Sequence, residues 1–159
     1  MPKNYLLTPG PTSVPAEVLL SMAHPIFHHR TPRFQAIMKD TIARAKRVLM
    51  TDNELAILTS SGTGAMEMAV ANLASSGRKA LTVEGGKFGE RWSELCAAFG
   101  FEHEAIKLEW GTAVDPKAIE EKLAADASIA AVFVTQSETS TGVLTDVKAI
   151  GEIVAKTDA

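Results

Sequence analysis

The sequence predicts an α/β fold in three layers, with helices on both faces of a mostly parallel sheet. Two observations lead to this prediction. Short apolar runs alternate with helical patterns of about ten residues, which is typical of successive β–α–β units. One run, residues 129–135, is almost uninterrupted, and a continuous apolar strand indicates burial on both faces of a sheet. The chain has 159 residues, 46% of them hydrophobic and 22% charged, and such a composition supplies a core.

The first 50 residues have a different pattern. The density of proline within residues 1–15 disfavours a helix and predicts an extended arm with turns. Residues 18–22 suit one or two helical turns. Thr31 as N-cap and Pro32 at the first helical position then begin a longer amphipathic helix that should end near Met50.

The remaining elements are expected in a regular order. Strands are predicted over residues 55–58, 80–83, 102–108 and 129–135, and helices over residues 63–74, 88–99, 115–124 and 146–156. We therefore expect an amino-terminal arm (1–15), amino-terminal helices (16–50) and part of an α/β domain (51–159).

Composition argues against several classes of partner. A formal net charge of −3 without a basic stripe argues against nucleic acid. No apolar run approaches the roughly 18 residues of a membrane span. The single cysteine, Cys96, excludes an internal disulfide and a cysteine-rich zinc site, and we expect it to pack inside a helix. We expect no metal, no membrane contact and a cytoplasmic location.

The first candidate site is the segment 59–67, Thr-Ser-Ser-Gly-Thr-Gly-Ala-Met-Glu, between a predicted strand and a predicted helix. Its glycines allow a tight turn, its hydroxyls offer hydrogen bonds, and the helix start offers N–H groups and a positive dipole end. These features predict a phosphate site, although an ordinary strand-to-helix turn is the alternative. The segment matches neither a Walker loop nor the dinucleotide fingerprint.

The second candidate site is the segment 84–92, Glu-Gly-Gly-Lys-Phe-Gly-Glu-Arg-Trp, which again follows a predicted strand. Phe88, set between glycines, could lie flat over a planar ligand. The alternative, which the pattern alone favours, is that Phe88 only anchors the next helix to the core.

The third candidate site is the segment 135–143, which follows the most apolar strand and is rich in hydroxyls. Ligands of open α/β sheets bind beyond the carboxyl ends of strands, so this loop suits a polar ligand, with a solvated loop as the alternative. A phosphorylated, planar and polar cofactor would engage all three segments, and pyridoxal phosphate has that chemistry.

Five segments in order resemble the class V aminotransferases, a family of fold-type I pyridoxal-phosphate enzymes, and in particular the alanine– or serine–glyoxylate and –pyruvate transaminases. These segments are residues 8–15, 28–34, 60–67, 88–91 and 138–142. The resemblance implies an incomplete large domain of that fold, pyridoxal 5'-phosphate as cofactor, and a homodimer. It also implies transfer of an amino group from a small amino acid, alanine or serine, to a 2-oxo acid such as glyoxylate or pyruvate.

The resemblance implies roles for individual residues. Ser61, Gly62 and Thr63 match the loop that binds the cofactor phosphate. Phe88 matches the aromatic residue stacked on the pyridine ring, which raises that interpretation above the core alternative. Thr139 matches a hydroxyl residue near the phenolic oxygen, and Gly10 a glycine of the arm that lines the substrate pocket. The His29-Arg30 segment is similar to one near the active site and subunit interface, without an assigned role.

No catalytic residue is assigned, because the family's Schiff-base lysine lies beyond the matching segments. The chain is thus expected to be the amino-terminal portion of an enzyme, inactive alone, with the remaining carboxyl-terminal part as a possible partner. One alternative is a non-catalytic half-domain that binds phosphate or the cofactor. Another is a different class V enzyme, such as a lyase or desulfurase. Desulfurases typically carry a histidine over the ring, whereas this chain has Phe88.

Overall fold

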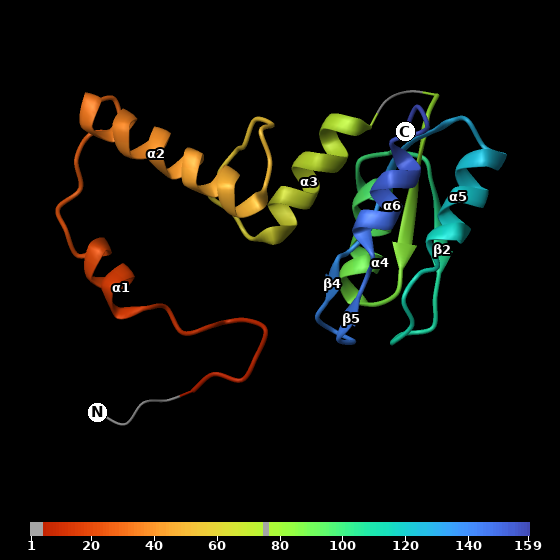
Figure 1. Cartoon of the computed structure of the whole chain (residues 1–159), viewed down its shortest axis with the longest axis horizontal. Coiled ribbons are helices and arrows are strands. Elements are labelled where there is room, and N and C mark those ends of the chain that lie inside the picture. Colours follow the sequence, from red (N-terminus) through yellow and green to blue (C-terminus); the bar gives the residue numbers. More distant parts are fainter. Residues whose placement is uncertain (1–4, 75–76) are drawn as a thin grey trace. The chain divides into compact units, whose positions relative to one another are not determined.

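The computed structural model describes residues 5–74 and 77–159 as two compact units, residues 1–57 and residues 58–159 (Figure 1). Each unit is described by itself. No helix within the described residues has both the length and the apolar character needed to cross a bilayer.

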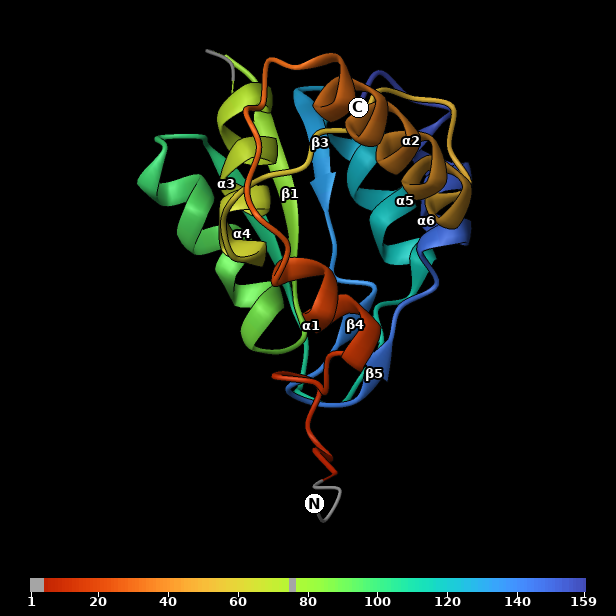
Figure 2. The same cartoon turned by 90° about the vertical axis from the view of Figure 1, so that its left-hand side faces the viewer.

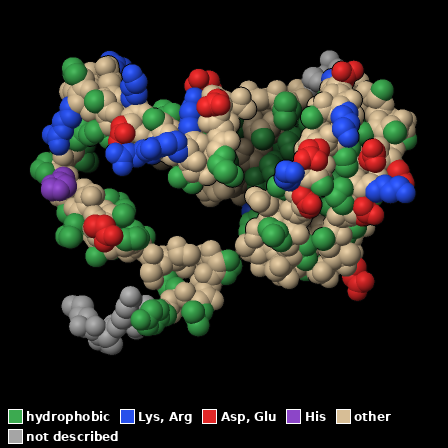
Figure 3. Space-filling view, viewed as in Figure 1, with side chains coloured by type: hydrophobic (Ala, Val, Ile, Leu, Met, Phe, Trp, Pro, Cys, Tyr) green, Lys and Arg blue, Asp and Glu red, His purple; other side chains and the backbone are tan. Residues whose placement is uncertain are grey.

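The amino-terminal unit contains two helices, α1 (Ala16–Met22) and α2 (Pro32–Leu49). The Thr31 hydroxyl accepts a hydrogen bond of 3.3 Å from the Phe34 N–H and so caps α2, as the sequence predicts. Met50 ends this helix in the left-handed conformation, with φ 51°. The side chains of α1 are exposed, and Figure 3 shows hydrophobic atoms over α1 and Lys and Arg side chains along α2.

The carboxyl-terminal unit is built on a parallel three-stranded sheet with the order β2-β1-β3. Its strands are β1 (Lys79–Glu84), β2 (His103–Lys107) and β3 (Ile129–Phe133). Ala80 of the central strand pairs with His103 on one edge and with Ala131 on the other. A short antiparallel pair, β4 (Ser137–Glu138) and β5 (Val143–Leu144), follows β3.

Helices cover both faces of this sheet, which confirms the predicted three-layer α/β fold (Figure 2). They are α3 (Gly62–Leu73) and α4 (Lys87–Ala98) on one face, and α5 (Pro116–Ala125) and α6 (Val147–Val154) on the other. One hydrophobic cluster joins Val70 of α3 and Cys96 of α4 to the sheet, and a second joins Ile119 of α5 and Ile150 of α6 to its other face. Each layer therefore buries one side of the strands.

Two expectations about strands differ from the structure. Residues 55–58 form no strand in the part of the chain that the structure describes, because they pair with neither edge of the sheet β2-β1-β3. Burial on both faces holds for the central strand β1, where Ala80 to Val83 are buried. It fails for β3, within the apolar run 129–135, where Ile129, Ala131 and Phe133 are buried but Ala130 and Val132 are only partly buried. It also fails for β2, where residues 103–106 are partly buried and Lys107 is exposed.

Candidate functional site

The second and third predicted segments meet at one cavity, of about 310 Å³, in the carboxyl-terminal unit. Parallel strands end at the same edge of a sheet, so the loops after β1 and β3 are brought together there. The cavity is lined by Met66, Phe88, Trp92, Val134, Thr135, Ser137 and Thr139. Phe88 and Thr139, which lie 51 positions apart in the sequence, thus face the same space as Met66 of α3.

The first predicted segment forms the start of α3. Ser61 is its N-cap in extended backbone, and among the described residues no side chain caps the first turn at this position. The first-turn N–H groups of a helix lack partners within the helix and carry the positive end of its dipole. A Cβ atom on Gly62 would meet nothing within 4 Å, so the turn faces open space. This arrangement can accept a phosphate.

Arg91 adds a positive charge beside this turn. Its Nη1 atom donates a hydrogen bond of 3.0 Å to the Thr63 hydroxyl. The carbon atom of the same guanidinium lies 5.4 Å from the centroid of the Phe88 ring. One cation on α4 therefore links the predicted phosphate loop with the predicted ring-stacking residue, and sequence reasoning did not single it out.

Phe88 is positioned as a wall of the cavity. Its side chain is 38% exposed, and it belongs to neither hydrophobic cluster of the described residues. Trp92, one turn further along α4, stacks instead on Phe133 with ring centroids 4.8 Å apart. The core role that the pattern alone favours for Phe88 is thus taken by Trp92, which leaves the Phe88 ring available to a ligand.

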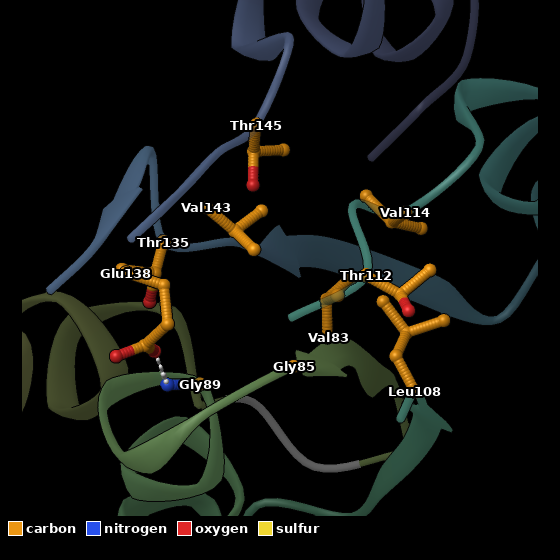
Figure 4. Close-up of a pocket in the computed structure, with 10 residues that line it drawn as sticks. All are labelled: Val83, Gly85, Gly89, Leu108, Thr112, Val114, Thr135, Glu138, Val143 and Thr145. Atoms are coloured by element: carbon orange, nitrogen blue, oxygen red, sulfur yellow. Dashed lines mark hydrogen bonds between the residues drawn. The ribbon is translucent and has the colours of Figure 1, made fainter. Parts of the chain in front are cut away.

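Glu138 is only 4% exposed, and its carboxylate points toward the N–H of Gly89 at the start of α4 (Figure 4). Its Oε2 atom accepts hydrogen bonds from the backbone N–H groups of Phe88, at 3.0 Å, and Gly89, at 2.9 Å. Its Oε1 atom accepts hydrogen bonds from Ser140, at 2.6 Å from the hydroxyl and 3.2 Å from the N–H. A buried carboxylate therefore joins the start of α4 to the loop after β3.

The protonation of Glu138 follows from these contacts. Burial by itself would raise the pKa of the Glu138 carboxyl. The hydrogen bonds from the Ser140 hydroxyl and from the N–H groups of Gly89, Ser140 and Phe88 outweigh that effect and hold the pKa below its ordinary value. Glu138 is accordingly a carboxylate at neutral pH. Sequence reasoning placed it only within a polar loop, because its partners lie about 50 residues away in the chain.

The other residues singled out by the sequence lie elsewhere. Cys96 is fully buried in a hydrophobic cluster, and burial raises the pKa of its thiol to about 11, which supports a packing role. Gly10 and His29 belong to the amino-terminal unit, so the substrate-pocket role of Gly10 stays a prediction. His29 lines a surface hollow of that unit with Phe34 and Met38.

Comparison with known protein families identifies the family to which this chain belongs. The family described as aminotransferase class-V matches residues 4–159. The chain belongs to the class V aminotransferase family. This confirms the expected family, and class V aminotransferases are pyridoxal-phosphate enzymes, which confirms the expected cofactor.

Three curated relatives illustrate the similarity of this class V aminotransferase chain. It is 42% identical to an uncharacterized aminotransferase of Methanocaldococcus jannaschii, over 99% of this chain and 41% of that protein. It is 45% identical to the soluble hydrogenase 42 kDa subunit of Anabaena cylindrica, over 96% of this chain and 40% of that protein. It is 38% identical to the serine–glyoxylate aminotransferase of Hyphomicrobium methylovorum, over 92% of this chain and 37% of that protein.

A solved structure gives the same assignment. The ureidoglycine–glyoxylate aminotransferase of Bacillus subtilis is similar with a TM-score of 0.93 and 29% identity, over 100% of this chain and 41% of that one. The chain thus spans about two fifths of the length of the relatives that it matches.

Proposed function

We propose that this chain forms the phosphate- and ring-binding part of a pyridoxal-phosphate-dependent transaminase. The observation that carries the proposal is the cavity shared by Phe88 and Thr139, beside a helix start whose Thr63 is held by Arg91. We propose that residues 1–15 serve as its arm, residues 16–50 as its amino-terminal helices, and residues 51–159 as part of its large domain.

The described residues fit the parts of the cofactor. The phosphate carries negative charge, which suits the open first turn of α3 at Ser61, Gly62 and Thr63 and the neighbouring Arg91 guanidinium. The pyridine ring is flat, which suits the partly exposed face of Phe88. The Thr139 hydroxyl is the group that we assign to the ring oxygen.

Each of these residues has a definite task in the proposed reaction. The bound cofactor supplies an electron sink for the carbanion that forms at the Cα atom of the amino acid. Phe88 keeps the ring in one plane, so that the orientation of the reacting bond is fixed. Ser61, Gly62 and Thr63 hold the phosphate in place while the ring end of the cofactor reacts. Thr139 donates a hydrogen bond or accepts one at the ring oxygen.

The substrates are proposed from the chemistry of the relatives. The names of two relatives, serine–glyoxylate aminotransferase and ureidoglycine–glyoxylate aminotransferase, both include the 2-oxo acid glyoxylate. This supports a small 2-oxo acid, such as glyoxylate or pyruvate, as the amino acceptor. We propose serine or alanine as the amino donor. We also propose a homodimer, which the exposed apolar side chains of α1, such as Leu20 and Met22, support by offering a surface to cover.

We assign no residue of this chain as the lysine that bonds to the cofactor. Lys148 is 87% exposed on α6 and pairs with Glu152, and it does not line the cavity of Phe88 and Thr139. We therefore expect the 159-residue chain by itself to bind the cofactor with little or no turnover.

Binding of pyridoxamine 5'-phosphate to the purified chain tests this proposal. This form of the cofactor has no aldehyde, so it does not react with surface lysines. Phe88→Ala should weaken its binding about fivefold through the lost stacking surface. Trp110→Ala is the matched control, because Trp110 is also an exposed aromatic residue but does not line the cavity of Phe88 and Thr139.

The readouts are isothermal titration and an assay for amino transfer from serine to glyoxylate. Saturable binding by the wild type that depends on Phe88 and not on Trp110 supports the proposal. Equal binding by wild type and Phe88→Ala contradicts it. Robust transamination by the chain alone would refute the expectation that it lacks the reacting lysine.

A further inference from the structure

We infer that Glu138 is a positioning residue for the cofactor ring, because its carboxylate fixes Phe88 relative to Thr139. The inference rests on the function proposed above. Glu138 does not line the cavity of Phe88 and Thr139, so it would act through these two neighbours rather than by contact with the ring. It is adjacent to Thr139 in the chain and hydrogen-bonded to the N–H of Phe88.

The contacts of Glu138 span two loops that are far apart in the sequence. One carboxylate oxygen accepts from the N–H groups of Phe88 and Gly89 in the first turn of α4, which is a 12-residue helix. The other oxygen accepts from Ser140, whose hydroxyl oxygen accepts a bond of 3.0 Å from the Lys87 N–H. The N–H groups of Lys87, Phe88 and Gly89 are first-turn donors without partners within the helix. The loop after β3 thus supplies hydrogen-bond acceptors for the N–H groups in the first turn of α4.

The loop before α4 and the loop after β3 lie so close together that a side chain larger than glycine does not fit between them. A Cβ atom on Gly86 would lie 2.4 Å from Cγ of Glu138 and 2.7 Å from Oγ of Ser140. A Cβ atom on Gly89 would lie 2.5 Å from the carbonyl oxygen of Val83. The two glycines permit the carboxylate to reach the backbone N–H groups of Phe88 and Gly89, and Figure 4 shows the contact with Gly89.

A carboxylate is required by the number and type of its partners. Every group that faces the two oxygens is a donor: three N–H groups and one hydroxyl. An amide in the same place would present its NH₂ group to at least one of these donors, so one buried contact would become repulsive. Glu138→Gln therefore keeps the shape of the side chain and loses at least one of the four contacts.

The test compares a ring-bearing ligand with a ligand that has no ring. Pyridoxamine 5'-phosphate should bind Glu138→Gln about tenfold more weakly than the wild type, and its induced circular dichroism should fall, because the ring is no longer held in one orientation. Inorganic phosphate, followed by the NMR shift of the Thr63 N–H, should bind both proteins equally. A general loss of structure would weaken both ligands. Glu121→Gln, on the exposed face of α5, is the control.

Ser140→Ala is the milder second variant. It removes the hydroxyl that donates to Glu138 at 2.6 Å and accepts from the Lys87 N–H at 3.0 Å, but it keeps the bonds of Glu138 to Phe88 and Gly89, so it should cause a smaller loss in the same direction. If Glu138→Gln does not fold, Ser140→Ala decides the inference. An unchanged ratio of the two affinities and unchanged circular dichroism in a folded variant overturn the role of Glu138. A wild type that does not bind pyridoxamine 5'-phosphate contradicts the proposed function itself.

Discussion

The Arg91 guanidinium donates a 3.0 Å hydrogen bond to the hydroxyl of Thr63, and this contact joins α4 to the first turn of α3. The two residues lie 28 positions apart in the sequence. The same guanidinium lies 5.4 Å from the ring centroid of Phe88, so a single side chain borders both ends of the proposed cofactor site. The positive charge of Arg91 and the positive end of the α3 dipole both attract an anion, so together they favour binding of the phosphate at the start of α3.

Replacing Arg91 should weaken phosphate binding. We expect Arg91→Gln to bind inorganic phosphate and pyridoxamine 5'-phosphate about tenfold more weakly, because a charge-assisted contact is lost. Arg91→Lys should recover part of the affinity, since it keeps the charge but not the planar fork. Titration at low and high salt measures both effects. Arg44→Gln, at an exposed position of α2, is the control, and equal affinity in Arg91→Gln and wild type would contradict the assignment.

The buried Glu138 carboxylate predicts a loss of stability in acid. Its folded-state pKa lies below the ordinary value of 4.5, so the unfolded chain binds a proton first as the pH falls. The stabilisation is complete above about pH 4.5 and is lost as the pH falls through the lowered pKa of the folded state. Urea unfolding between pH 3 and pH 7 should therefore show a steeper acid limb for the wild type than for Glu138→Gln.

Asp126 provides the comparison for this experiment. The side-chain hydrogen bond from Lys79, 2.8 Å long, and those from Ser128 hold the pKa of Asp126 below its ordinary range. Asp126→Asn should remove a separate part of the acid limb, and the Glu138→Gln effect should persist in that background. Identical pH slopes in wild type and Glu138→Gln would show that Glu138 does not titrate as its contacts require.

Gly89 should tolerate no side chain. A Cβ atom added at Gly89 would lie 2.5 Å from the Val83 carbonyl oxygen and 3.2 Å from the Glu84 Cα atom. Both are backbone atoms of the central strand, so they cannot shift without disturbing the sheet. Gly89→Ala should lower the free energy of unfolding by about 1–3 kcal/mol. Gly151→Ala is the matched control, because Gly151 lies in α6 with nothing within 4 Å, and it should stabilise by about 0.5–1 kcal/mol. Thermal unfolding of both variants checks the opposite signs.

Cys96 should be inert in the folded chain. Its side chain is fully buried, and burial raises the pKa of the thiol to about 11, so little thiolate forms at neutral pH. We expect a thiol reagent such as dithionitrobenzoate to label it slowly in buffer and rapidly in urea. In a Cys96→Ala background, a cysteine at the exposed position Ala97 on the same helix should react at once. Rapid labelling of native Cys96 would contradict the packing role.

Elements with local signals are those that the sequence predicts well. The Thr31-Pro32 start of α2 and the Asp115-Pro116 start of α5 both appear, and Asp115 accepts a 2.9 Å bond from the Lys117 N–H. Caps and turns of this kind depend on atoms within three or four residues, which a local pattern records. The strand expected over residues 55–58 depends instead on a partner, which a local pattern does not contain.

By itself the sequence determined the class V family, the order of helices α1 to α6 and of strands β1 to β3, and the segments 59–67, 84–92 and 135–143 as candidates. The tertiary structure decided which side chains share a cavity, that Trp92 and not Phe88 packs into the core, and that Glu138 and Arg91 hold the loops. The physical reason is separation along the chain. Hydrogen bonds between residues 28 to 50 positions apart exist only once the parallel strands align the ends of their loops.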